Sequence, residues 1–246
     1  MTEGAASNEV RQEPIDVVLR MHSDEVREAL ASKPYVEKLL WTLEGWHAPT
    51  ARHSVRAAEL VRREAEERGY DHDRLIRTIR GALIHDVGKR YVSRETLSGT
   101  TRKSDFKPAQ ATQLEDHSVV GRNLVRQAQR AMDPDSPPDE ALAIVEFHHS
   151  FQPDPYPEFD ARLVPNEGRA QTIEDIKLVA LAEKIDAFLS VDGREYAKNQ
   201  QTGKFDPMPY AVMRKTLNAD YYTEDEVKAA ITHYMELYPD NRGVAW

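Results

Sequence analysis

The chain has 246 residues, no cysteine, 33 basic and 42 acidic residues, and a formal net charge of −9. The lack of cysteine excludes thiolate metal sites, catalytic thiols and disulfides, and the acidic balance disfavours sequence-independent binding to long nucleic acids. The sequence has no apolar run of 18 residues and begins without a basic, apolar leader. We therefore expect a cytoplasmic protein that makes no membrane contact. A homodimer is compatible with the sequence.

The N-terminal part of the chain is expected to hold a polar tail followed by helices. Residues 1–13 are small and polar, which predicts disorder, and residues 15–30 have the apolar spacing of a helix. Proline, glycine and capping residues then mark the ends of further helices. These helices run from Pro34 to Trp46, from Pro49 to the stop at Gly69, and from Asp71 or Asp73 to His85.

The remainder of the chain is predicted to consist of helices separated by long loops. Residues 88–114, 150–171 and 191–209 are rich in glycine, serine, threonine or proline and are expected to be loops. The sequence shows neither an alternating strand pattern nor an internal repeat, which favours an all-α fold. Helices are predicted over residues 114–132, 139–149, 172–188, 208–217 and 224–238, the last with Thr223 and Glu226 as a capping box.

Five of the nine histidines fall inside or at the end of an apolar helix, as do two aspartates. One inward histidine by itself is usually a hydrogen-bonded core residue, but seven nitrogen and oxygen donors without sulfur suit divalent metals. We predict two divalent metal ions, with Fe or Mn favoured and Zn, Ni or Mg as alternatives, and with Asp86 shared between them. The predicted ligands are His53, His85, Asp86, His117, His148, His149 and Asp186.

The order of these histidines and aspartates resembles the HD superfamily of metal-dependent phosphohydrolases. Residues 85–89 match the His-Asp-x-Gly-Lys motif of that family. The tandem pair His148-His149, together with residues 186–196, resembles the HD-GYP branch. The similarity covers roughly residues 45 to 215. It implies an all-α HD-domain helical bundle with long loops around a dinuclear metal site.

The resemblance also implies an activity and a role for each site residue. The activity would be hydrolysis of phosphodiesters, especially cyclic di-GMP, by a metal-bridging hydroxide, with Asp86 and Lys89 as catalytic residues. Lys89 and Arg194 would contact the phosphate of a small substrate, and Tyr156 is either a ring that stacks on a base or a packed loop aromatic. One metal site would use His53, His85, Asp86 and Asp186, and the other would use Asp86, His117, His148 and His149.

Three departures from the HD-GYP pattern change what we expect. The Gly-Tyr-Pro element appears only as Pro155-Tyr156-Pro157, and Ser150 follows the tandem histidines where the branch has Glu. Some relatives hold a third metal with a Glu four residues before the first histidine, and that position here is Pro49. These changes predict two metals instead of three and disfavour cyclic di-GMP as the substrate.

Three functions remain open, and the preferred one is hydrolysis of a phosphoester in a nucleotide or cyclic dinucleotide. A mixed-valent di-iron oxygenase acting on a small polyol or phosphonate is an alternative, although the tandem pair His148-His149 argues against it. The third is a catalytically silent ligand-binding module, which is supported mainly by the altered loop at residues 150–171. We expect residues 1–32 to form an N-terminal tail and helix, and residues 33–246 to form one HD-type catalytic domain with C-terminal helices.

Overall fold

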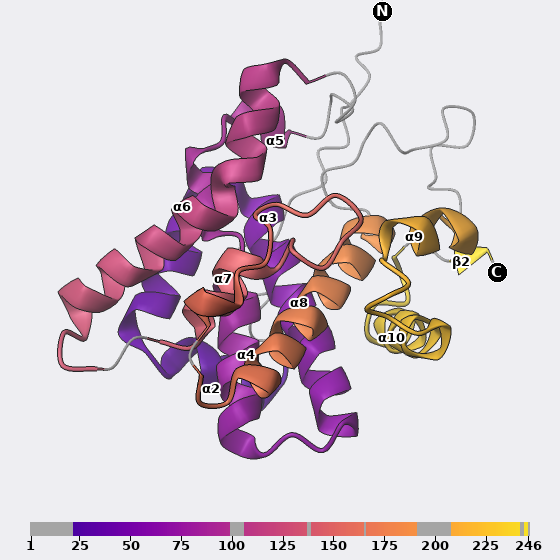
Figure 1. Cartoon of the computed structure of the whole chain (residues 1–246), viewed down its shortest axis with the longest axis horizontal. Helices are drawn as coiled ribbons and strands as arrows, with labels where there is room; N and C mark the ends of the chain where they lie inside the picture. The colour runs from indigo at the N-terminus through magenta and orange to yellow at the C-terminus, as the bar shows by residue number, and fades with distance from the viewer. Residues whose placement is uncertain are drawn as a thin grey trace, which may run out of the picture.

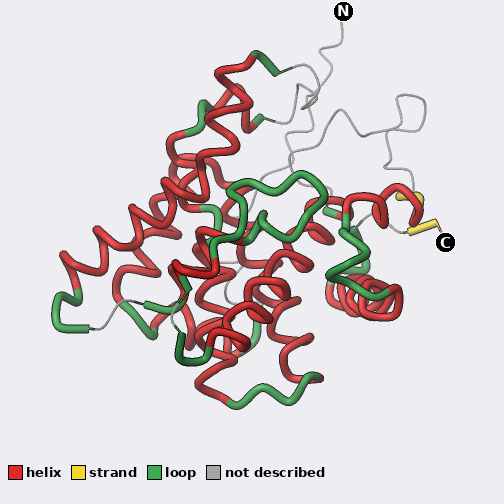
Figure 2. The backbone as a smooth tube through the Cα atoms, in the orientation of Figure 1, coloured by secondary structure: helices red, strands yellow, loops and turns green. Residues whose placement is uncertain are grey.

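The computed structural model describes residues 22–98, 106–136, 139–164, 166–190, 208–241 and 244–245. Regular structure in these residues is helical, apart from two short strands, β1 (Met208–Pro209) and β2 (Val244–Ala245), which pair in parallel (Figure 2). The prediction of an all-α fold is therefore confirmed. Within the described residues, no helix combines the length and the apolar character needed to cross a membrane.

The longest helix, α3 (Pro34–Glu67), bends at His47, where φ is −152° and ψ is 89° (Figure 1). Pro49 explains the bend, because proline has no N–H and its ring clashes with the carbonyl four residues earlier. That carbonyl belongs to Gly45 and accepts a hydrogen bond from Arg94 Nη2 (3.0 Å). The two helices predicted on either side of this point are therefore the two arms of one bent helix.

The other helices pack around α3 and share its core. Helix α7 (Ala141–Phe147) packs against α4, α6 and α8, and the short helices η3 (Ala161–Leu163) and α9 (Tyr210–Thr216) lie later in the chain. Buried apolar side chains such as Leu60, Ile79 and Ile176 join these elements into one core. Helices in direct contact with α3 include α2 (Asp24–Ala31), α4 (His72–Ile84), α6 (Pro108–Met132), α8 (Arg169–Leu189) and α10 (Glu224–Leu237).

Several helix boundaries differ from those predicted. Helix α6 begins at Pro108 instead of residue 114, because a proline suits the first turn and the Gln110 side chain accepts the Lys107 backbone N–H (3.0 Å). The loop predicted over residues 88–114 also holds the 3₁₀ helix η1 (Val87–Tyr91) and the short helix α5 (Arg94–Leu97). Helix α8 begins at Arg169. The predicted tail at residues 1–13 lies outside the described residues.

A buried carboxylate holds the start of α7 in place. Asp139 Oδ1 accepts hydrogen bonds from Arg80 Nη2 (2.8 Å) and from the Ala141 backbone N–H (2.9 Å), and the Tyr35 hydroxyl donates to Oδ2. The Asp139 side chain is 2% exposed. Burial raises the pKa of Asp139, but Arg80 and Tyr35 outweigh this effect and hold it below the ordinary value of 3.8.

We predict that Asp139→Ala lowers the free energy of unfolding by about 3 kcal/mol at pH 7, because Arg80 and Tyr35 lose a buried acceptor. Since the folded-state pKa is depressed, this stabilisation is present above the ordinary carboxyl pKa of 3.8 and decreases as the pH falls through the folded-state value. Urea denaturation at several pH values measures both effects. The exposed Asp135→Ala is the control and should change stability by less than about 0.5 kcal/mol.

Candidate metal centre

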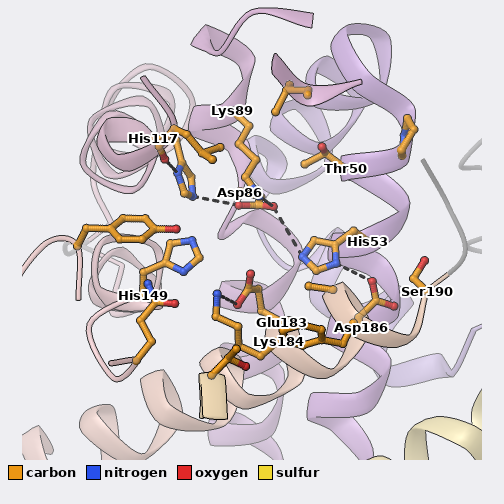
Figure 3. A pocket seen from close by; sticks show the side chains of 18 of the residues that line it. Thr50, His53, Asp86, Lys89, His117, His149, Glu183, Lys184, Asp186 and Ser190 are labelled. Atoms are coloured by element: carbon orange, nitrogen blue, oxygen red, sulfur yellow. Dashed lines mark hydrogen bonds and ion pairs between the residues drawn. The ribbon is translucent and has the colours of Figure 1, made fainter. Parts of the chain in front are cut away.

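Side chains from separate helices converge on one buried point, which Figure 3 shows from close by. The convergence follows from the helix ends, because α4, η1 and α7 all begin or stop beside it. The imidazoles and carboxylate concerned are buried, except that the His53 side chain is 13% exposed. Their places are His53 in α3, His85 directly after α4, Asp86 directly before η1, His117 in α6, and His148 and His149 directly after α7.

Four of these residues form the first cluster, in which one donor atom from each side chain lies within 4.8 Å of the others. The cluster consists of Asp86, His117, His148 and His149. His117 Nε2 lies 3.2 Å from Asp86 Oδ1, and His148 Nε2 lies 3.8 Å from the same oxygen. These are the residues predicted to hold one of the two metals.

The ring nitrogens of this cluster are set up as lone-pair donors. His117 and His148 each direct Nδ1 at the backbone carbonyl three residues earlier, so Nδ1 carries the proton and donates it. In the neutral form of each ring the proton is therefore on Nδ1 and Nε2 carries a lone pair, and the two Nε2 atoms lie 3.3 Å apart. Burial, together with His85 and His117, holds the pKa of His148 well below its ordinary value. Two facing lone pairs repel each other, and a cation between them removes that repulsion.

A second cluster consists of His53, His85 and Asp86, and here too one donor atom from each side chain lies within 4.8 Å of the others. His53 Nε2 lies 3.8 Å and His85 Nε2 lies 3.5 Å from Asp86 Oδ2. His85 donates Nδ1–H to the Ala82 carbonyl (2.7 Å), and burial lowers its pKa to about 4, so Nε2 is free to bind a metal. Asp86 belongs to both clusters, which is the arrangement expected of a carboxylate that two cations share.

The residues present fit a pair of divalent cations. Among the described residues, His85 Nε2 and both ring nitrogens of His149 are buried without a hydrogen-bond partner. Burial raises the pKa of Asp86, but Lys89 and the neighbouring imidazoles outweigh it and hold it well below the ordinary value. Lys89 Nζ donates to Asp86 Oδ2 (2.6 Å). Imidazole nitrogens around an ionised carboxylate are a donor set for Mn, Fe, Zn or Ni.

Two glycines allow the elements of the centre to approach one another. Gly88 of η1 packs against Gly121 of α6, and a Cβ on Gly88 would overlap the His117 carbonyl oxygen and lie 2.6 Å from the Gly121 nitrogen. Any side chain at residue 88 would therefore push η1 away from α6. This contact keeps Asp86, at the start of η1, close to His117.

The centre opens into a pocket of about 550 Å³, a size that suits a small ligand. Three lysines line it, Lys89, Lys184 and Lys215, together with aromatic side chains. The Tyr156 ring packs against the His149 ring, with centroids 4.5 Å apart. Arg194, the other predicted phosphate contact, lies outside the described residues.

Comparison with protein families matches residues 50–187 to the HD domain, which is more than half of the chain. The chain belongs to the HD-domain family. A search of curated proteins returns no match. The matched region of this HD domain contains every member of both clusters.

The structure places Asp186 beside the HD-domain centre but in neither cluster. Its carboxylate contacts His53 on the opposite ring nitrogen, Nδ1 (2.6 Å), and also contacts Arg56 and the Tyr234 hydroxyl. Burial raises the pKa of Asp186, but Arg56 and His53 outweigh it, so the group stays ionised. Its predicted role as a metal ligand stays a prediction.

Glu183, which the sequence pattern did not single out, lies one helical turn before Asp186 on α8 of the HD domain. Figure 3 shows its carboxylate between His53 and His149, directed toward Asp86. The side chain is 6% exposed, and among the described residues Oε2 has no hydrogen-bond partner, although Lys184 Nζ lies 3.5 Å away. The spacing of three residues from Asp186 was the available signal, since it places both acids on one helix face.

Proposed function

We propose that this HD domain is a metal-dependent phosphohydrolase that cleaves a phosphoester in a small phosphorylated molecule. The observation that carries the proposal is the buried pair of His/Asp clusters sharing Asp86 at the floor of a lysine-lined pocket. HD domains are typically metal-dependent hydrolases, and such a centre is compatible with that chemistry. When bound, two divalent cations would supply an acidified water and offset the charge that develops on the phosphoryl oxygens.

The protein side chains would bind and orient the substrate. Lys89, one turn after Asp86, would donate to a phosphoryl oxygen beside the centre. Lys184 and Lys215 line the same pocket and would attract an anionic substrate. Phe106 and Tyr156, also in the lining, would contact an apolar or aromatic part of the molecule, such as a base.

The tandem histidines support a position near the HD-GYP branch. His148 and His149 both belong to the cluster around Asp86, and this tandem pair is the feature that the shorter HD pattern lacks. The loop after them carries Pro155-Tyr156-Pro157 in place of Gly-Tyr-Pro, and Tyr156 packs on His149. Because this loop departs from the Gly-Tyr-Pro element, we favour a mononucleotide or linear dinucleotide over cyclic di-GMP as the substrate.

We further propose that Glu183 is a metal ligand of the cluster containing His53 and His85. Burial raises the pKa of Glu183, but Lys184 and His53 outweigh it and hold it below its ordinary value, so the carboxylate is charged. A charged, buried oxygen without a hydrogen-bond partner among the described residues is costly unless a cation binds it.

Glu183→Gln is expected to weaken Mn²⁺ binding at this cluster by at least about tenfold, because it removes the charge from a buried donor. Binding at the cluster with His117 and His148 should be preserved. Mn²⁺ titration followed by isothermal calorimetry measures both sites. The control is Glu174→Gln, an exposed acid on the same helix that pairs with Arg74. Equal Mn²⁺ affinity in wild type and Glu183→Gln would refute the ligand assignment.

The activity is tested on protein purified without oxygen and analysed for metal. We expect two metals per chain and hydrolysis of at least one phosphoester among cyclic dinucleotides, linear dinucleotides and mononucleotides, with activity lost on chelation and restored by Mn²⁺ or Fe²⁺. The Asp86→Ala protein provides the background rate. Two bound metals without turnover of any phosphoester would indicate a binding module, and oxygen-dependent turnover of a phosphonate would indicate an oxygenase.

A further inference from the structure

Asp186 is surrounded by hydrogen-bond donors from α3 and α10. Its Oδ1 accepts from Arg56 Nε (2.6 Å) and from the Tyr234 hydroxyl (2.7 Å). Its Oδ2 accepts from His53 Nδ1 (2.6 Å) and from Arg56 Nη2 (3.1 Å). An ionised carboxylate offers about four lone-pair positions, so these four donors occupy all of them. Glu183 differs in this respect, because its Oε2 accepts no hydrogen bond among the described residues.

We propose that Asp186 is a positioning residue that orients His53 toward the metal centre and does not itself bind metal, an inference that rests on the proposed function. By accepting a hydrogen bond from Nδ1–H, Asp186 selects the neutral His53 tautomer in which Nε2 carries a lone pair. Nε2 is the nitrogen that faces Asp86 Oδ2, at 3.8 Å. The two ring nitrogens point away from each other, so a carboxylate on Nδ1 lies across the ring from a cation on Nε2.

His53 is held differently from the other histidines of the centre. His85, His117 and His148 each donate Nδ1–H to a backbone carbonyl of their own segment. His53 instead donates to a carboxylate from another helix. A carboxylate partner fixes the ring and makes the opposite nitrogen more basic, and so strengthens its bond to a metal.

Through Tyr234, helix α10 contacts Asp186 and so is connected to the metal centre. The Tyr234 hydroxyl of α10 is fully buried, donates to Asp186 and accepts a hydrogen bond from Asn241 Nδ2 (2.8 Å). Tyr234 lies beyond residues 50–187, the region that matches the HD domain. The structure thus links a segment outside the family match to the orientation of one metal ligand.

The test is Asp186→Asn, which keeps the shape of the side chain. Arg56 Nε and Tyr234 both donate to one oxygen, so the amide oxygen should remain on their side and the NH₂ group should face His53. That group would donate to Nδ1 and force the His53 proton onto Nε2. We expect ¹⁵N NMR of the metal-free protein to show this change of tautomer. Mn²⁺ affinity at the cluster of His53 and His85 should fall 10- to 100-fold.

A second variant separates positioning from general stability. Tyr234→Phe and Tyr222→Phe each remove a buried hydroxyl, and the Tyr222 hydroxyl donates only to the Lys177 carbonyl (3.0 Å) in the described structure. Both variants should lower Tm to a similar extent. Only Tyr234→Phe should weaken Mn²⁺ binding, by up to about tenfold, because it loosens Asp186.

The outcomes distinguish this inference from the proposed function. Weaker Mn²⁺ binding in Asp186→Asn with the His53 tautomer unchanged would overturn the inference and make Asp186 a ligand. An unchanged tautomer with unchanged affinity would also overturn it. Failure of the wild-type protein to bind Mn²⁺ would refute the proposed function. The His53 tautomer, compared by NMR between metal-free wild type and Asp186→Asn, would still show whether Asp186 orients His53.

Discussion

Asp86→Ala is expected to abolish binding of both metals and to reduce phosphoester hydrolysis to the background rate. Asp86 is the only residue common to the two clusters within the described structure, and its two oxygens face different sets of imidazoles. Alanine removes the negative charge that would offset both cations and leaves Lys89 without its carboxylate partner. Cation repulsion in a buried site then opposes binding at either position. Metal content by mass spectrometry and turnover of the substrate found in the screen measure the effect.

A matched control for this variant is Asp175→Ala, which removes another buried carboxylate. Asp175 is 1% exposed and pairs with Arg74 on the surface of α8 that faces α4. We expect its loss to destabilise the fold while both metals remain bound. If the Asp86→Ala protein retained two metals per chain, the shared role of Asp86 would be wrong.

Gly88→Ala is expected to have the second largest effect, because the new methyl group has no space. It would overlap the His117 carbonyl, and both neighbouring groups are backbone atoms that cannot rotate away. We predict a loss of about 4 kcal/mol or more in the free energy of unfolding, and weaker metal binding at the cluster with His117. Urea denaturation and Mn²⁺ titration measure the two effects.

Alanine substitutions at two other glycines serve as controls for Gly88→Ala. Gly45 lies inside α3 with no atom within 4 Å of an added Cβ, so Gly45→Ala should be neutral or stabilising by up to about 1 kcal/mol. Gly121→Ala should fall between the two, because its Cβ would lie 3.1 Å from the Val145 side chain and 3.2 Å from the Gly88 nitrogen, both longer than the closest contacts of a Cβ on Gly88. Similar stability for Gly88→Ala and Gly45→Ala would show that η1 and α6 are not in tight contact.

Local signals in the sequence were sufficient to predict much of the fold. The capping box of Thr223 and Glu226 marks the start of α10, and Pro49 marks the bend in α3. The start of α6 was missed because Lys107 lacks the short polar side chain of a usual N-cap, so only Pro108 signals it. The two-residue strands were missed because two residues carry no periodicity.

The candidate site was predictable where the residue type is rare and unpredictable where it is common. Few histidines lie on apolar helix faces, so His53, His117 and His148 were identified by spacing. Glutamate is frequent on exposed helix faces, so Glu183 did not stand out until the structure placed it in the pocket. The partner of Asp186 depends on the packing of α10 against α8, which no local pattern encodes.

The donors of the centre come from α3, α4, η1, α6 and α7, and so from segments spread over most of the HD domain. An unfolded chain cannot bring these atoms together, so metal ions at the proposed sites would bind only the assembled bundle. Thermodynamic linkage then requires that each metal site stabilise the fold, by about 2.7 kcal/mol at a free concentration one hundred times its dissociation constant. Chelators would therefore make the protein easier to melt and to digest with proteases, and the supply of metal in the cell would influence how long the protein survives.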